Sequence, residues 1–251
     1  MNFHLLTIFP DILQSYTDKG MIRIAQEKKL IEIKYHDLRD FAVDKHGTVD
    51  DRPFGGGVGQ VFMVEPIVKT LDKIINPSIL AKLSQALSST TLSRTFLTAG
   101  ALAKAVVRNR DKHNRKIILL SAKGKKWTQS LAREYATLDE VVFICPRYEG
   151  VDERVKEFID EEISLGDFVL TGGELGAAVI MDSITRLIPG VLGKEESFLD
   201  ESHSTEGYLE YPQYTRPEVF TYEGKEYKVP DVLLSGHHAQ IKDWRDQHST
   251  K

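Results

Sequence analysis

Two apolar runs joined by one segment of helical periodicity constrain the fold of this chain most. The runs are KIILLSAKG (residues 116–124) and VVFICP (141–146), and the helical pattern lies between them at 127–137. Because a strand, a helix and a second strand in this order place the two strands parallel, they predict a parallel sheet. Further strand patterns occur at 3–9 and 31–38. The sequence therefore predicts an α/β fold.

Two glycine-containing loops lie next to predicted strands. The sequence RYEGVDER (147–154) follows one strand, and ISLGDFVLTGGE (163–174) leads from another strand into the apolar helical pattern at 174–190. Glycines such as Gly166, Gly172 and Gly173 allow a backbone to approach a ligand closely, and the first-turn N–H groups of a helix face such a ligand. Glycine pairs also make plain turns. The repetition of the pattern favours one shared binding site.

Composition excludes several classes of protein. The chain has 251 residues, one cysteine and 41% hydrophobic content, and it contains no run of 18 apolar residues. These features predict a soluble, cytoplasmic protein without a membrane span, a disulfide or a cysteine-based metal site. Cys145 lies inside an apolar strand pattern and is predicted to be a buried, unreactive side chain.

The net charge of −4 argues against a general polyanion binder, although a local basic patch can still contact phosphates. Two basic clusters are candidates for such a patch, and each can equally be a solvated face. The first cluster comprises Arg108, Arg110, Lys112, His113, Arg115 and Lys116, and the second comprises Lys123, Lys125 and Lys126.

Other segments suggest further functional surfaces. The glycine-rich loop in VDDRPFGGGVGQVFM (49–63) can fit around a ligand or remain a mobile surface loop. Asp182 and Arg186 have the spacing of a helix-stabilising ion pair. The polar stretch at 193–207 reads as an interdomain linker, and a hairpin at 221–229 and a terminal helix from about Ser235 follow it.

Six strings in this chain resemble the bacterial tRNA (guanine-N1-)-methyltransferases in the same order over nearly the whole length. They are VDDRPFGGGVG, RYEGVDERV, GDFVLTGGE, DSITRLIPGVLG, YTRPEVF and LLSGHHAQIKDWR. The resemblance implies methyl transfer from S-adenosylmethionine to N1 of guanosine 37 in the anticodon loop of tRNA, with activity aided by Mg²⁺. It also implies a homodimer in which the interdomain loop of one subunit closes over the cofactor of the other.

The implied architecture is a parallel-sheet SPOUT domain with a deep trefoil knot and a small, mainly helical C-terminal domain. No sequence pattern would suggest a knot, so this element rests on the resemblance alone. The expected divisions are a cofactor domain at 1–193 with an insertion at about 72–116, an interdomain loop at 194–210, and a short tRNA-binding domain at 211–251.

Carried over by position, the resemblance places the cofactor in three loops of the predicted sheet. The implied cofactor-binding residues are Leu119, Leu120, Ser121, Ala122, Pro146, Tyr148, Glu149, Gly150, Ser164, Leu165, Gly166, Asp167, Phe168, Val169, Leu170, Gly172 and Gly173.

The implied catalytic residues are Arg186, which meets the guanine, and a carboxylate that removes the N1 proton. The family has an aspartate directly before a serine in the interdomain loop, whereas here Glu201 precedes Ser202 and Asp200 lies one position earlier. We therefore expect Glu201 to be the base, with Asp200 as the alternative. No protein-bound metal is expected. The implied substrate-binding residues are Arg52, Gly57, Gly59, Arg186, Ser202 and Arg216, with Lys123 as a further phosphate contact.

Two other functions compete with this interpretation. The altered base position and the short C-terminus would also fit a catalytically silent RNA-binding protein that kept the cofactor loops. A nucleotide hydrolase is less well supported, because the sequence lacks a GxxxxGK[ST] loop.

Overall fold

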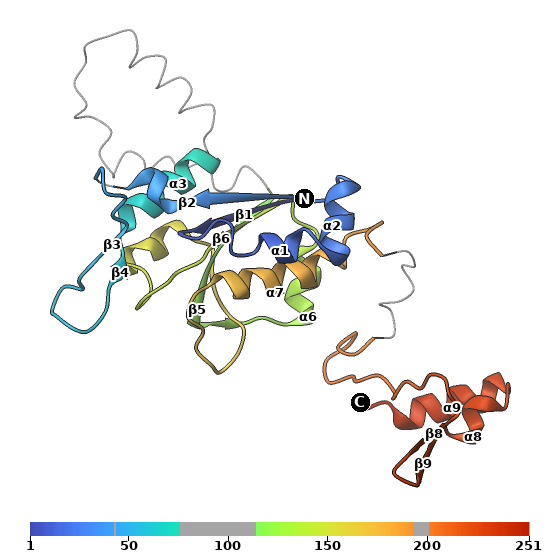
Figure 1. The fold of residues 1–251 in the computed structure, drawn as a ribbon. Helices are drawn as coiled ribbons and strands as arrows, with labels where there is room; N and C mark the ends of the chain where they lie inside the picture. The colour runs from blue at the N-terminus through green and yellow to red at the C-terminus, as the bar shows by residue number, and fades with distance from the viewer. Residues whose placement is uncertain (43, 76–113, 193–200, 251) are drawn as a thin grey trace. The chain divides into compact units, whose positions relative to one another are not determined.

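The computed structural model describes residues 1–42, 44–75, 114–192 and 201–250 (Figure 1). The chain divides into two compact units, Met1–Leu192 and Gly193–Lys251.

The first unit is built on a five-stranded sheet in which every pair of neighbouring strands is parallel. The predicted parallel-sheet α/β class is thus confirmed. The strand order across the sheet is β2-β1-β6-β5-β7. The strands are β1 (Asn2–Thr7), β2 (Glu32–Asp37), β5 (Arg115–Lys126), β6 (Glu140–Ile144) and β7 (Glu161–Ser164).

Both faces of this sheet are covered, which explains why its strands read as continuous apolar runs. Along β6, Val141 and Phe143 enter one hydrophobic core, while Val142 and Ile144 enter the other. Figure 1 shows α7, α6 and α2 on one side of the sheet and α3 on the other. These helices are α2 (Gly20–Glu27), α3 (Val64–Ile75), α6 (Gln129–Tyr135) and α7 (Glu174–Thr185).

Strand β5 pairs with β7 in two separate stretches. Ile118 to Leu120 pair with the start of β7, and Lys125 and Lys126 pair with its end, so residues 121–124 leave the regular ladder. At Gly124 an added Cβ would lie 2.4 Å from the carbonyl carbon of Glu162. Since no side chain fits at that distance, this glycine allows the two backbones to approach closely.

Some boundaries differ from the sequence expectations. The apolar spacing of Ile12, Leu13, Tyr16, Met21, Ile22 and Ile24 would suit a single helix after Pro10, but this segment forms two helices, α1 (Gln14–Thr17) and α2, because the backbone of Lys19 between them is extended. The expected insertion was drawn too wide, since residues 72–75 belong to α3 and 115–116 to β5. The rest of that insertion, residues 76–113, lies outside the described residues.

Small elements complete the two units. In the first, they are η1 (Leu38–Phe41), η3 (Glu153–Phe158) and the short hairpin of β3 (Asp50–Asp51) and β4 (Val61–Phe62). The second unit contains an antiparallel hairpin of β8 (Val219–Tyr222) and β9 (Lys225–Lys228), followed by α8 (Asp231–Leu234) and α9 (His238–His248).

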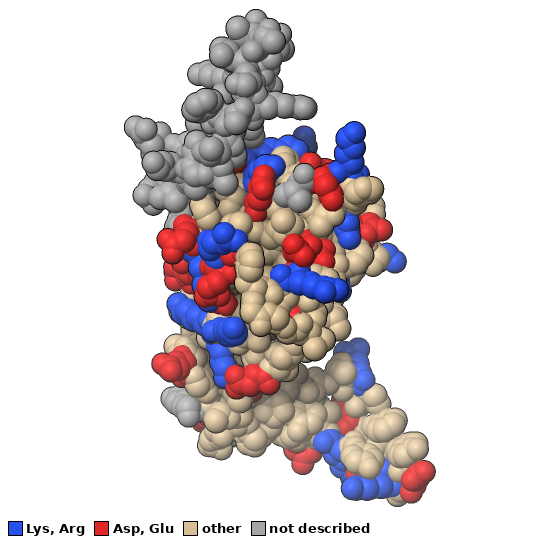
Figure 2. All heavy atoms as spheres, turned by 90° about the vertical axis from the view of Figure 1, so that its left-hand side faces the viewer, with Lys and Arg blue, Asp and Glu red and all other residues tan. Residues whose placement is uncertain are grey.

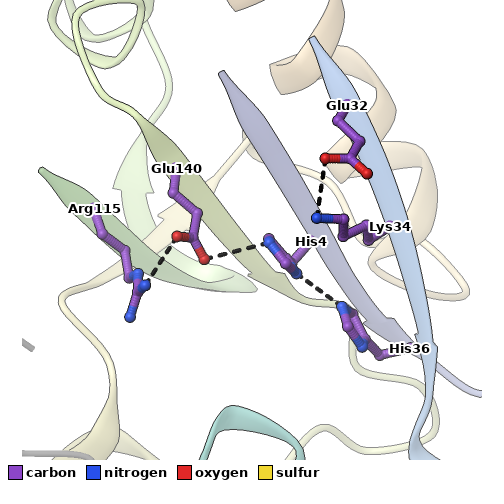
Figure 3. Close-up of polar contacts among 6 residues, drawn as sticks. All are labelled: His4, Glu32, Lys34, His36, Arg115 and Glu140. Carbon is purple, nitrogen blue, oxygen red and sulfur yellow. Dashed lines mark hydrogen bonds and ion pairs between the residues drawn. The ribbon is translucent and has the colours of Figure 1, made fainter. Parts of the chain in front are cut away.

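A chain of polar contacts crosses the first unit's sheet from β5 to β2 (Figure 3). His4 Nδ1 lies 2.8 Å from His36 Nε2, and His4 Nε2 lies 3.3 Å from a carboxylate oxygen of Glu140. The other oxygen of Glu140 accepts a hydrogen bond of 2.9 Å from Arg115. Burial, followed by the charge of His36, lowers the pKa of His4 to about 3. Burial, followed by the charge of Lys73, lowers the pKa of His36 to about 4.

Both imidazoles are therefore neutral in the folded protein at pH 7, and this has a consequence for acid stability. Below the ordinary histidine pKa of about 6.5 the unfolded chain binds protons that the native protein does not, so the free energy of unfolding falls between about pH 6.5 and 4. For His4 alone the loss at pH 5 is about 2 kcal/mol.

We predict that His4→Gln flattens the decrease of unfolding free energy between pH 7.5 and pH 5, as measured by urea denaturation. The matched control is His46→Gln, because His46 is exposed and its substitution should leave the slope unchanged. An identical slope in wild type and His4→Gln would contradict the assignment of neutral His4.

Candidate functional site

A cavity of about 260 Å³ opens at the carboxyl ends of β6 and β7 and beside residues 119–123, where β5 leaves its regular ladder. Because parallel strands present these ends at one edge of a sheet, the loops that follow them meet there. Three segments line the cavity, at 119–123, at 146–151 and at 162–173 except for residues 166 and 167. Gly176 on α7 and Glu153 and Lys156 on η3 complete the lining.

Nearly all residues predicted to bind a cofactor line this cavity. The exceptions are Gly166 and Asp167. Asp167 points away and forms an exposed ion pair of 2.7 Å with Lys126. The carbonyl of Gly166 accepts hydrogen bonds from Ser164 Oγ and the N–H of Phe168, so this glycine shapes the turn.

The cavity has an apolar part and a charged part. Leu119, Leu120, Ile163 and Leu165 supply apolar lining next to the start of α7. A Cβ at Gly176 would lie 3.1 Å from Leu120 Cδ1, so the glycine allows the helix to begin against β5. Such a mixture of apolar walls and a few polar groups is typical of sites for small organic molecules.

Several charged residues of the lining were missed by the sequence analysis. Lys156 lies between Glu153 and Glu162, at 2.7 and 3.1 Å from their carboxylates. The pKa of Glu162 is lowered overall. Burial alone would raise it, but the hydrogen bond from Ser121 and the charge of Lys156 outweigh this effect. The lining residues that were not among the predicted cofactor-binding residues are Lys123, Arg147, Val151, Glu153, Lys156, Glu162, Ile163, Thr171 and Gly176. Of these, Lys123 was predicted as a phosphate contact, and Arg147, Val151, Glu153, Ile163 and Thr171 lie within the two predicted glycine-containing loops.

The sequence contained a usable signal for some of these residues. Arg147 and Glu153 belong to the same RYEGVDER string that predicted the site, and Glu162 directly precedes the ISLGDF loop. The prediction rested on glycines in loops, whereas Glu162 reaches the cavity from β7, and Glu153 and Lys156 reach it from the 3₁₀ helix η3. Their convergence depends on the order of the strands in the sheet, which local sequence patterns do not reveal.

A buried ion pair lies behind the cavity wall. Glu174, whose side chain is only 2% exposed, is 3.0 Å from Nε of Arg147. Thr7 donates a hydrogen bond of 2.7 Å to the same carboxylate. Cys145 is fully buried nearby, as predicted, and burial, followed by the charge of Glu174, raises the pKa of its thiol. A neutral, buried thiol is a poor nucleophile.

The glycine-rich loop between β3 and β4 contacts the second cavity segment. The N–H of Glu149 donates to the carbonyl of Gln60 at 3.0 Å, and the N–H of Phe62 donates to the carbonyl of Gly150 at 2.9 Å. At Gly59, which has φ +92°, an added Cβ would lie 2.6 Å from Glu149 Cγ. The predicted substrate residue Gly59 is thereby placed beside the cavity.

The other predicted substrate residue in that loop, Gly57, is exposed, as is the neighbouring Arg52. Four glycines of the loop adopt positive φ angles. The apolar side chains of Phe54 and Val58 on the same loop are almost completely exposed. The structure thus presents this loop to solvent next to the cavity.

Of the predicted catalytic residues, Arg186 belongs to the first unit and lies away from its cavity. Arg186 caps the carboxyl end of α7, which is about 18 Å long, whereas the cavity lies at the amino end of that helix. Glu201, Ser202 and Arg216 belong to the second unit, where Ser202 Oγ accepts a hydrogen bond from the N–H of Glu210. Asp200 lies outside the described residues.

The two predicted basic clusters have different environments. Arg115 is buried in the sheet, and Lys116 pairs with Glu161 at 3.0 Å. The rest of that cluster, residues 108–113, lies outside the described residues. Lys123 lines the cavity. On the face shown in Figure 2, acidic and basic side chains of the first unit are interspersed.

Within 1–42, 44–75, 114–192 and 201–250, no group of three or more histidine, cysteine or acidic side chains is arranged to hold a metal ion. No helix in this part of the chain is long and apolar enough to cross a membrane.

Comparison with known proteins gives a consistent result over the full length. The model of the family described as tRNA (Guanine-1)-methyltransferase TrmD matches residues 1–93 and 92–251. A tRNA (guanine-N(1)-)-methyltransferase of Clostridioides difficile is 41% identical over 100% of this chain and 93% of its own length. Proteins with the same name from Citrifermentans bemidjiense and Clostridium botulinum are 44% identical, each over 98% of this chain and 83% and 85% of their lengths.

Proposed function

The chain belongs to the tRNA (guanine-1)-methyltransferase family, and we propose that its cavity binds S-adenosylmethionine for methylation of N1 of guanosine 37 in tRNA. The enzyme transfers methyl groups to N1 of guanine in tRNA. The named relatives cover almost the whole chain, so the alternative of a catalytically silent RNA-binding protein is not retained.

The observation that carries the cofactor proposal is the composition of the cavity lining. Apolar Leu119, Leu120 and Ile163 suit the faces of an adenine, and backbone groups of the 165–173 loop suit its edge. Carboxylates such as Glu149 suit ribose hydroxyls. When bound, S-adenosylmethionine supplies a methyl group on a sulfonium, and the chain's task is to hold the acceptor nitrogen in line with it.

We also propose that the chain forms the trefoil knot of the SPOUT fold around this site. Support comes from residues 121–124, which leave the β5 ladder and pass against the backbone of β7 at Gly124. The segment is then fixed by Trp127, whose backbone N–H donates to the carbonyl of Ser164 and whose indole N–H donates to Ser183 on α7. In a knot, a later part of the chain threads through an earlier loop. The contacts at Gly124 and Trp127 would hold such a loop in place.

We also propose a homodimer that buries the exposed face of α7. Leu175, Val179, Asp182 and Arg186 recur at helical spacing and form one stripe. Leu175 and Val179 are 58% and 51% exposed, although they are apolar. Tyr16, which donates a hydrogen bond of 2.8 Å to Asp182, widens this surface. Phe9 and Ile12 are also exposed apolar residues of the first unit. Apolar patches of this kind mark interaction surfaces.

This dimer would give Arg186 its role. Arg186 lies far from its own subunit's cavity but on the stripe that the partner covers, so it can reach the partner's site. There its guanidinium stabilises negative charge on O6 of the guanine, while Glu201 removes the N1 proton. The exposed Arg52 and Arg216 and the glycines Gly57 and Gly59 are proposed to hold the tRNA. Since tRNA is the substrate, we place the enzyme in the cytoplasm.

The interface proposal predicts that Val179→Asp converts the dimer into a monomer, because a buried carboxylate without a partner is costly. Sedimentation equilibrium should give a dimer dissociation constant at least about 100-fold weaker. The matched control is Val58→Asp, since Val58 is 93% exposed on the glycine-rich loop. A dimer of unchanged affinity in Val179→Asp would contradict the interface.

Substrate position is tested with methyl-labelled S-adenosylmethionine and two tRNA transcripts. One transcript carries guanosine at 37 preceded by guanosine, and the other carries adenosine at 37. We expect label only in the first, with less label after Mg²⁺ is removed by a chelator. Equal labelling of both transcripts would contradict position 37, and unchanged labelling without Mg²⁺ would contradict a role for the metal.

The base is tested by exchanging carboxylates for amides. Glu201→Gln should lower the single-turnover rate by about 10²–10⁴-fold, because proton removal from N1 is lost. Asp200→Asn is the matched variant one position away and should retain the rate. A large loss only in Asp200→Asn would assign the base to Asp200, and a loss of no more than a few-fold in both would contradict a carboxylate base in this loop.

A further inference from the structure

Arg147 and Glu174 connect two walls of the cavity from behind. Arg147 follows β6 and lines the cavity, whereas Glu174 is the first residue of α7 and directly follows the third cavity segment. The Arg147 Nε lies 3.2 Å from one carboxylate oxygen of Glu174 and 3.0 Å from the other. The side chains are 18% and 2% exposed. The pair therefore lies where solvent screening is weak.

Further groups fix the orientation of both partners. Thr7 is buried; its hydroxyl donates to Glu174 and accepts a hydrogen bond of 3.0 Å from the N–H of Phe9. The guanidinium carbon of Arg147 lies 4.8 Å from the centre of the Phe9 ring. A carboxylate in the first turn of a helix is also favoured by the helix dipole. These contacts leave the ion pair little freedom.

The turn at 171–173 packs directly on this ion pair. A Cβ at Gly172 would lie 2.3 Å from Arg147 Nε and 2.6 Å from a carboxylate oxygen of Glu174. A Cβ at Gly173 would lie 2.7 Å from the Cα of Cys145. The N–H of Gly173 donates to the carbonyl of Pro146 at 2.9 Å. The glycines are thus required for contact between the two cavity segments.

We propose that Arg147 and Glu174 are positioning residues that hold the 171–173 turn against the 146–150 segment and so keep the cofactor cavity in its binding shape. The assignment rests on the proposed cofactor site. It adds two residues that contribute to cofactor binding indirectly, by holding the cavity segments in place. Loss of the pair lets the two segments separate, and cofactor affinity falls because binding must first restore their arrangement.

The test compares Glu174→Gln and Arg147→Lys with Arg115→Lys. Arg115 is a matched control, because it is 5% exposed and pairs with Glu140 at 2.9 Å near the beginnings of the strands, away from the cavity. Each protein is measured without ligand by hydrogen exchange of amides 166–173. Its affinity for S-adenosylmethionine is then measured by calorimetry, and its stability by urea denaturation.

We expect faster exchange at 166–173 and a cofactor dissociation constant about 10- to 100-fold weaker in Glu174→Gln and Arg147→Lys. At saturating cofactor the turnover rate should recover most of its wild-type value. Arg115→Lys should lose stability without either effect. If Glu174→Gln does not fold, Thr7→Val provides a milder disturbance of the same carboxylate.

Unchanged exchange and unchanged affinity, with a loss of stability equal to that of Arg115→Lys, would overturn the proposal and leave a purely structural ion pair. Failure of the proposed function is recognised separately, since wild type would then not bind S-adenosylmethionine. The exchange measurement needs no ligand, so it decides the role of the pair in either case.

Discussion

Parallel pairing of β5 with both β6 and β7 is the constraint on which the rest of this molecule depends. It brings three loops to one edge of the sheet, where they enclose the cavity. Hydrophobic cores cover both faces of the strands, so polar chemistry is confined to the strand ends. The site is therefore a consequence of strand direction, and its specificity comes from the residues that follow each strand.

The two ends of the sheet carry buried ionic groups with different consequences. Near the strand beginnings, Glu140 joins Arg115 to neutral His4 and stabilises the pairing of the strands themselves. Near the strand ends, Glu174 joins Arg147 across two loops that have no ladder between them. The same type of ion pair thus stabilises paired strands at one end of the sheet and loops at the other. In those loops, glycines stand where a side chain would not fit.

The sequence predicted the sheet class and most of the cavity lining, because apolar runs and the glycines between strand and helix are local signals. It did not predict Lys156 and Glu162 in the lining, because their approach depends on the long-range pairing of β5 with β7. It misplaced Asp167, because the carboxylate of this residue forms an exposed ion pair with Lys126 outside the cavity. The knot is a global property of the path, and the proposed catalytic role of Glu201 still rests on resemblance.

The contact between the glycine-rich loop and the second cavity segment has a thermodynamic consequence. Gln60 and Phe62 share backbone hydrogen bonds with Glu149 and Gly150, so the conformations of the two segments are not independent. If the glycine-rich loop holds tRNA and the second cavity segment holds the methyl donor, as proposed, each ligand selects among the same set of backbone conformations. Linkage then requires reciprocity: the factor by which donor binding changes tRNA affinity equals the factor by which tRNA changes donor affinity.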